Sequence, residues 1–160
     1  MAYINSDHEK LAHEPDCPFC AAPGKSDEEG LIVHRGELCY VVLNLYPYNS
    51  GHLLVCPYEH VAGYAEVSAQ TRAELGELSA KAMTVLGSVM AAQGFNLGMN
   101  QGAVAGAGVA GHLHQHVIPR WGGDMNFFPI VAQTKALPQL LGDTRRELAR
   151  AWEAEGRDVR

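Results

Sequence analysis

Hydrophobic and polar residues follow two different periods along this chain. Between residues 30 and 60, short runs of β-branched and apolar residues alternate with turn-forming segments such as Arg35-Gly36-Glu37, a pattern typical of antiparallel strands. From Ser68 to about Gln93, apolar residues instead recur every three or four positions, which predicts a long helix with Ser68 as its N-cap. The strands predicted in the first region are 31–33, 38–45 and 52–56.

The second half of the chain adds two strands and one amphipathic helix. We predict strands at 95–100 and 112–119, on either side of a loop at 101–111 that is rich in Gly and Ala. A helix over about 137–153 would place Leu148 and Trp152 on one face and arginines on the other. Five strands with one long inserted helix and a C-terminal helix indicate the α+β class, built on an antiparallel sheet of about five strands.

The first 29 residues show neither period. Pro15, Pro18 and Pro23 interrupt regular structure there, so we expect residues 1–29 to form an arm and loop ahead of a single domain at 30–160. A chain of 160 residues is long enough to bury one core. Its hydrophobic share of 47% and charged share of 19% exclude an intrinsically disordered protein.

The charge balance argues against duplex nucleic acid as a partner. Twelve Lys and Arg residues stand against 18 Asp and Glu residues, and the formal net charge is -6. Nonspecific binding to a duplex needs a surplus of cationic side chains that displace counterions from the phosphates. This chain has no such surplus.

The sequence also predicts a cytoplasmic protein without a membrane span. The N-terminus lacks the basic and apolar segments of a secretory signal. Residues 82–119 contain no Asp, Glu, Lys or Arg, but seven glycines and several polar residues interrupt this segment. No window of about 20 residues is therefore apolar enough to cross a bilayer.

Three histidines alternate with other residues in the last predicted strand. Because side chains two residues apart share a face of a strand, we expect the imidazoles of His112, His114 and His116 to line one surface. A neutral imidazole is a good nucleophile toward phosphorus and forms an adduct whose phosphoryl group can be transferred again. The alternatives are a metal-chelating strand and a chance enrichment.

The Gly/Ala-rich loop before these histidines is a candidate anion site. Backbone N–H groups near Gly106, Gly108 and Gly111 could form a concave site for phosphate oxygens. Loops of this composition are equally often simple tight turns, so the composition alone leaves both interpretations open.

Cys17 and Cys20 form a Cys-x-x-Cys motif, a spacing that suits two thiolates on one tetrahedral zinc ion. A thioredoxin-like redox pair would begin a helix after a strand, whereas this motif lies in a Pro-rich arm. A pair of free surface thiols is the third interpretation. Cys39 and Cys56 lie in apolar strand segments and are expected in the core.

Several of these segments resemble one known family. The run His112-Leu-His114-Gln-His116-Val-Ile, after a Gly-rich loop, resembles the signature of the histidine-triad superfamily. The segment 40–57 is similar to two strands of its fragile-histidine-triad branch, and the segments 119–127 and 139–146 are similar to the diadenosine tetraphosphate phosphorylases of that branch. The resemblance covers most of residues 30–130 and implies the histidine-triad fold.

The resemblance implies a nucleotidyl hydrolase or transferase that cleaves dinucleoside polyphosphates through a nucleotidyl-histidine intermediate. By resemblance, His114 is the nucleophile, His116 helps the leaving group to depart, and His52 supports the pocket. Water and inorganic phosphate both stay open as the acceptor that releases the nucleotide.

The same resemblance assigns residues that bind the substrate. Asn44 would bind the ribose, Asn100 would contact the phosphate or the leaving group, and Gly106 and Gly108 would offer backbone donors to phosphate. Taken alone, Asn44 could be a turn former and His52 a histidine at a strand end. Residues 107–111 lack the Ser, Thr or Gln that family members usually carry there, so only backbone donors remain.

That departure keeps a second function class open, a nucleotide-binding regulatory protein with little turnover. A uridylyltransferase-like enzyme is a poorer alternative, because that group has Gln at the third triad position, where this chain has His116.

The resemblance also implies a structural zinc ion and a homodimer. It completes the metal site of Cys17 and Cys20 with His60 and His112, although His8 or His13 could replace one of these histidines. No cofactor is expected to be required for catalysis, and Mg²⁺ can accompany the polyphosphate substrate. Domains of this superfamily usually pair into a homodimer through the long helix and an edge strand.

Overall fold

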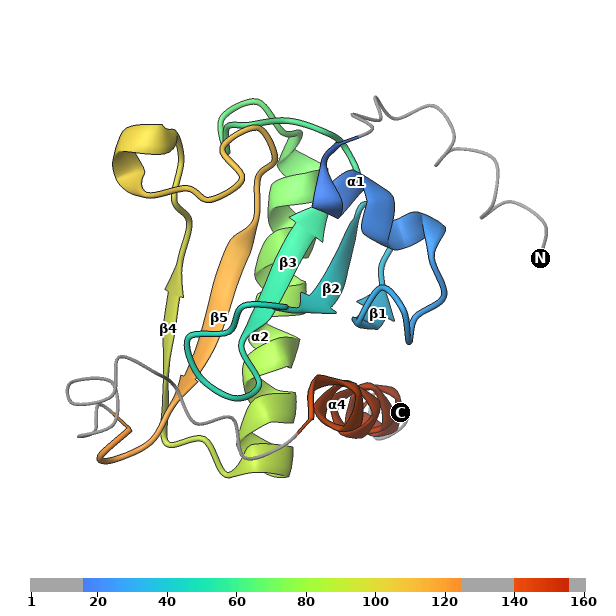
Figure 1. Ribbon diagram of the computed structural model, residues 1–160, viewed down its shortest axis with the longest axis vertical. Helices are drawn as coiled ribbons and strands as arrows, with labels where there is room; N and C mark the ends of the chain where they lie inside the picture. Colours follow the sequence, from blue (N-terminus) through green and yellow to red (C-terminus); the bar gives the residue numbers. More distant parts are fainter. Residues whose placement is uncertain (1–15, 125–139, 156–160) are drawn as a thin grey trace.

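The computed structural model describes residues 16–124 and 140–155, and one antiparallel sheet organises them (Figure 1). The strand order is β1-β2-β3-β5-β4, so the two central strands are β3 and β5. The predicted α+β class and the number of strands are confirmed. The strands are β1 Ile32–Arg35, β2 Cys39–Leu43, β3 Leu53–Pro57, β4 Gly94–Gly98 and β5 Gln115–Arg120.

One long helix, α2 (Ala69–Met90), connects β3 to β4 and lies behind the sheet in Figure 1. As predicted, Ser68 caps its start, because the Ser68 side chain accepts a hydrogen bond of 3.0 Å from the Thr71 N–H. The helix ends earlier than the predicted Gln93. Ala91 takes a left-handed conformation with φ of +50°, and the chain leaves the helix there.

Both faces of β2 and β3 are buried, and the alternation of side chains along these strands assigns each residue to a face. Val41 and Val55 pack toward α2 and the C-terminal helix α4 (Leu141–Glu155), whereas Tyr40 and Leu54 belong to a smaller cluster on the opposite face. Trp152 of α4 is 1% exposed and stacks on His34 of β1. The α2 face therefore carries the main core, which leaves the other face for the site.

The predicted arm is more regular than its proline content suggests. Its described part forms a short helix, α1 (Pro18–Ala21), followed by a 3-10 turn, η2 (Ala22–Gly24). Cys17 and Cys20 are buried, with exposed fractions of 7% and 3%. This arrangement excludes the interpretation of the two thiols as free surface groups. Residues 1–15 lie outside the described residues, so the arm boundary at residue 29 stays a prediction.

The strand that carries the histidines begins later than predicted. β5 starts at Gln115, so His112 and His114 precede the strand and the three imidazoles do not share one strand face. Two hydrogen bonds hold this segment outside the backbone pairing between β3 and β5. The Leu113 N–H donates to the Val61 carbonyl at 2.6 Å, and the ring of His114 bonds the carbonyl of His112.

None of the described helices is long and apolar enough to span a bilayer. The C-terminal helix begins at Leu141, later than the predicted start near residue 137, and residues 125–139 lie outside the described part of the chain.

The loop between β2 and β3 depends on Gly51. This residue has φ of +76°, and a Cβ atom on it would lie 2.5 Å from the Met90 sulfur and 3.1 Å from Leu86. Replacing Gly51 by Ala is expected to lower the free energy of unfolding by about 1–2 kcal/mol or more, measured by chemical denaturation.

Gly76 is a matched control for this substitution. It lies in the interior of α2, where an added Cβ would meet nothing within 4 Å. Gly76→Ala should therefore raise the free energy of unfolding by about 0.5–1 kcal/mol, because alanine is the better helix former. Equal effects of the two substitutions would contradict this account of Gly51.

Candidate active site and metal site

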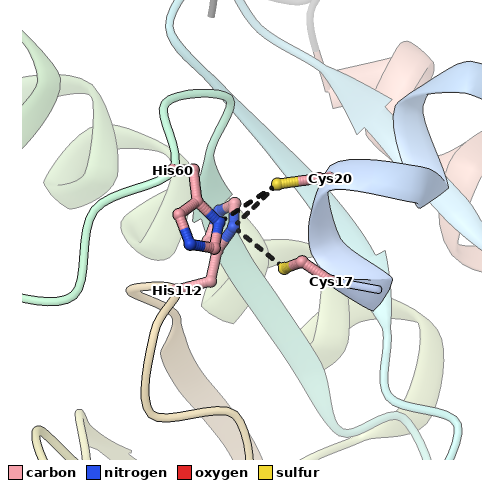
Figure 2. A group of neighbouring side chains, drawn as sticks. All are labelled: Cys17, Cys20, His60 and His112. Atoms are coloured by element: carbon pink, nitrogen blue, oxygen red, sulfur yellow. Dashed lines mark hydrogen bonds between the residues drawn. The ribbon is translucent and has the colours of Figure 1, made fainter. Parts of the chain in front are cut away.

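Four side chains from three distant segments converge beside α1 (Figure 2). Their sulfur and nitrogen atoms all lie within 4.8 Å of one another. The Cys17 sulfur lies 3.4 Å from Nδ1 of His112, and the Cys20 sulfur lies 3.2 Å from Nδ1 of His60. Two thiols and two imidazoles form the donor set that zinc takes in structural sites. The predicted cluster of Cys17, Cys20, His60 and His112 is therefore brought together and could hold a metal ion.

His112 is oriented for such a role. Its Nε2 atom lies 2.9 Å from the Pro57 carbonyl, which can only accept, so Nε2 carries the proton and donates. The lone pair of Nδ1 is then directed at the two sulfur atoms. Burial lowers the pKa of His112 to about 4, partly offset by the hydrogen bond to Pro57, so the ring is neutral near pH 7. Neutral imidazole is the form that binds a metal.

The same residue orients the next histidine. The carbonyl of His112 accepts a hydrogen bond of 2.8 Å from Nδ1 of His114. Since a carbonyl only accepts, Nδ1 of His114 carries the proton and Nε2 has the free lone pair. The ring of His114 is buried, at 7% exposure, against the rings of Phe19 and His116. Nε2 of His114 is therefore the atom of this ring with a lone pair available for a nucleophilic role.

His52 and His116 are neighbours because of the register between β3 and β5. Leu53 pairs with Val117 and Leu54 pairs with His116, so His52 and His116 are diagonal neighbours on the face opposite α2. Diagonal neighbours in a sheet are within reach of each other when both side chains are aromatic. Nε2 of His52 lies 2.9 Å from Nδ1 of His116.

The hydrogen bonds around His52 assign the proton positions in this pair. Nδ1 of His52 accepts from the Tyr48 N–H at 3.1 Å, so the proton of the neutral ring lies on Nε2. That proton is donated to Nδ1 of His116, which leaves the proton of neutral His116 on its own Nε2. Burial and the nearby His114 lower the pKa of His116, which favours the neutral ring.

Nε2 of His116 is buried and has no hydrogen-bond partner among the described residues. A buried donor without a partner is unfavourable and is expected where a ligand completes the site. His114 thus offers a lone pair, and the neighbouring His116 offers an N–H. Together they can attack an electrophile and donate to the group that departs.

The remaining predicted residues lie at the edges of this site. Asn44 directs its Nδ2 toward Nδ1 of His52 at 3.3 Å, while its Oδ1 accepts from the Tyr46 N–H. Asn100 is half-buried and follows β4, two residues after Gly98, the residue that pairs with His116.

The Gly/Ala-rich loop offers fewer donors than predicted. It contains a 3-10 turn, η3 (Ala103–Ala105), and the N–H of Gly106 donates to the Ala103 carbonyl at 3.0 Å. The Gly106 N–H is therefore occupied within the turn, a correction to its predicted role as a phosphate donor. Gly108 is exposed in the same loop.

Two aromatic residues at the site were not predicted to have a role. Phe19, between the two cysteines, has its ring centroid 4.8 Å from that of His114. Tyr48 has its ring centroid 6.0 Å from that of His116, nearly parallel to it. The sequence shows Phe19 inside the Cys-x-x-Cys motif and Tyr48 four residues before His52. Neither residue belongs to a periodic pattern, so no pattern assigned it a role.

Comparison with known proteins places this geometry in a family. A model of the HIT domain matches residues 25–123. The chain is 52% identical over 138 residues to the AP-4-A phosphorylase of Mycobacterium tuberculosis, a match that covers 86% of this chain and 71% of that protein.

Two solved structures have the same fold. A Zn-bound histidine triad family protein from Mycobacterium smegmatis superimposes with a TM-score of 0.72 at 25% identity, covering 88% of this chain and 96% of that chain. A hypothetical histidine triad nucleotide-binding protein from Sulfolobus tokodaii strain 7 gives a TM-score of 0.73 at 29% identity, covering 89% and 96%.

Proposed function

This chain belongs to the HIT family, and on that premise we propose that it is an enzyme that cleaves dinucleoside polyphosphates, with phosphate as the acceptor. The observation that carries the proposal is the tautomer pair of the site. Nδ1 of His114 donates to the His112 carbonyl, which leaves a lone pair on Nε2, while the buried Nε2–H of His116 lacks a partner.

The first step is attack by Nε2 of His114 on the α-phosphorus of the substrate. A P–N bond forms and the bond from this phosphorus to the bridging oxygen breaks, so the remaining polyphosphate leaves. With diadenosine tetraphosphate, an adenylyl group stays on His114 and ATP departs. The His112 carbonyl stabilises the positive charge that develops on the imidazole.

His116 serves the leaving group. Its Nε2–H donates to the bridging oxygen as negative charge develops there. The hydrogen bond from Nε2–H of His52 to Nδ1 of His116 keeps the His116 proton on Nε2, where it can be donated to the leaving group. In the second step an oxygen of inorganic phosphate attacks the same phosphorus, the P–N bond breaks and ADP is released. The overall reaction converts diadenosine tetraphosphate and phosphate into ATP and ADP.

The name of the mycobacterial relative supports phosphate, rather than water, as the acceptor, since that protein is called a phosphorylase. For the substrate, we propose that Asn44 binds the ribose from the end of β2, and that Asn100 and the backbone of Gly108 contact phosphate oxygens.

We also propose that the four-residue cluster holds a structural zinc ion. The thiol and imidazole donors fit zinc, and one structural neighbour is zinc-bound. Cys17, Cys20, His60 and His112 would be its ligands, and the ion would fix α1 and the start of the His112–His116 segment. Mg²⁺ would enter only with the substrate.

A homodimer in the cytoplasm remains our expectation. β4 is an edge strand, and its Leu97 is 45% exposed, which supports pairing of this edge with a second copy.

His114→Ala should abolish turnover of diadenosine tetraphosphate, with a fall in kcat of at least about a thousandfold, because it removes the group proposed to form the nucleotidyl intermediate. Nucleotide binding should be retained and can be measured by calorimetry. His34→Ala is the control, since His34 lies on β1 against Trp152, and its kcat should match the unmodified chain. Full activity of His114→Ala would remove His114 as the nucleophile.

The acceptor is tested by incubating the chain with diadenosine tetraphosphate, with and without inorganic phosphate, and separating products by ion exchange. ATP and ADP that form only with phosphate are the expected products. AMP and ATP formed without phosphate would identify a hydrolase instead. If neither reaction occurs, the regulatory alternative gains support.

The purified chain should contain about one zinc ion per molecule when no chelator is used, as measured by elemental analysis. Cys20→Ser should lose most of the zinc and lower the melting temperature, because the cluster joins α1 to the sheet. Cys39→Ala removes a buried thiol outside the cluster and should keep the zinc. Zinc well below one equivalent in the unmodified chain would contradict the site.

A further inference from the structure

Hydrogen bonds of Asn49 link the middle of the β2–β3 loop to the C-terminal end of β5. Its Nδ2 donates to the Pro119 carbonyl at 3.0 Å and to Oδ2 of Asp124 at 2.9 Å. Both partners are acceptors, so the amide nitrogen, not the oxygen, must face them, and both of its hydrogens are used. The side chain therefore has one well-defined orientation.

The Asn49 side chain binds β5 beyond the point where the β3–β5 pairing stops. Pairing between β3 and β5 stops at Leu53, the first residue of β3, and Val117. The last residues of β5, 118–120, therefore extend beyond β3. The Pro119 carbonyl, two residues after Val117, takes its hydrogen bond from Asn49 instead of from a strand. The loop is thereby attached to β5 where the backbone ladder stops.

Asp124 is itself held as a charged acceptor. Arg120 binds it through both Nε and Nη2, at 2.5 and 2.7 Å, and the Trp121 N–H donates to it at 3.1 Å. The hydrogen bond with Arg120 keeps the pKa of Asp124 well below its usual range. Such a surface ion pair adds little stability, but it fixes the position of the carboxylate that receives Asn49.

The backbone around Asn49 determines the tautomer of His52. The Asn49 carbonyl accepts from the His52 N–H at 3.2 Å, and the preceding N–H, that of Tyr48, donates to Nδ1 of His52 at 3.1 Å. If the loop moved away, Nδ1 of His52 would lose this donor and keep the longer contact of 3.3 Å with Nδ2 of Asn44, which holds the proton off Nδ1 less firmly. In molecules where Nδ1 of His52 carries the proton, His116 receives none from His52 and could place its own proton on Nδ1.

We propose that Asn49 and Asp124 are positioning residues that hold His52 and His116 in their Nε2–H tautomers, and thereby aim the Nε2–H of His116 at the leaving group. The inference about the leaving group rests on the proposed function, whereas the tautomers can be measured without any substrate. Neither Asn49 nor Asp124 contacts the three triad histidines through its side chain, so both act through the loop and His52.

The test is nitrogen NMR of the full chain with ¹⁵N-labelled histidine, since long-range proton–nitrogen correlations distinguish the two neutral tautomers. In the unmodified chain, His52 and His116 should be Nε2–H tautomers and His114 the Nδ1–H tautomer. In Asn49→Ala, His52 and His116 should become mixtures, while His114 keeps its tautomer and reports that the site is still folded. The kcat for diadenosine tetraphosphate should fall about tenfold with little change in KM.

Asn96→Ala is the matched control. Asn96 accepts a hydrogen bond from Arg120 in the same cluster but lies on β4, away from the β2–β3 loop, so its removal should leave all three tautomers and kcat unchanged. Asn49→Asp gives a second variant of the same size, in which a carboxylate would face Asp124, and it should shift His52 and His116 as Asn49→Ala does.

Three results would overturn the proposal. The first is an Nδ1–H tautomer of His116 in the unmodified chain. The second is unchanged tautomers in both Asn49 variants. The third is an equal shift in Asn96→Ala. If the tautomers respond as expected and the chain cleaves no dinucleoside polyphosphate, the positioning role stands and the proposed function fails.

Discussion

The site depends on the two hydrogen bonds that His112 makes. Its ring donates to the Pro57 carbonyl and directs Nδ1 at the two cysteines, while its own carbonyl holds Nδ1 of His114. One residue therefore sets the geometry of both the candidate metal-ligand cluster and the proposed nucleophile, His114. Because the ring is buried, with its pKa lowered to about 4, it stays neutral and its geometry does not change with protonation near pH 7.

The proton positions at the site follow from groups that can only donate or only accept. Two backbone carbonyls and one backbone N–H, those of Pro57, His112 and Tyr48, assign the tautomers of three histidines. Buried imidazoles held in fixed orientations need no rearrangement when a phosphoryl group enters, which is how preorganised sites lower a barrier. The packed core behind the sheet keeps β3 and β5, and hence His52 and His116, in register.

Much of this arrangement could be predicted from the sequence. Strand alternation and helical periodicity are strong in residues 31–56 and 69–90, and the four metal-ligand candidates follow from the Cys-x-x-Cys motif together with the family resemblance. The start of β5 at Gln115 could not be predicted, because alternation alone continues through His112 and His114. That boundary depends on the contact of Leu113 with Val61, which comes from another segment, and on the bond of the His114 ring to the His112 carbonyl. The occupied N–H of Gly106 and the link from Asn49 to Asp124 likewise depend on tertiary geometry, which residue type does not reveal.

The cluster of Cys17, Cys20, His60 and His112 also constrains the order in which the chain can fold. Cys17 and His112 are 95 residues apart, whereas the β2–β3 hairpin and α2 are built from local contacts. Closing a long loop costs more chain entropy than closing a short one, so contacts near in sequence form readily while those distant in sequence form late. During synthesis, the two cysteines leave the ribosome long before their partner His112 exists. Cys20 can meet His60 earlier, but the full set of four side chains can assemble only after the segment up to His112 has been made. The ring of His114, which bonds the His112 carbonyl, gains its final orientation with this last closure.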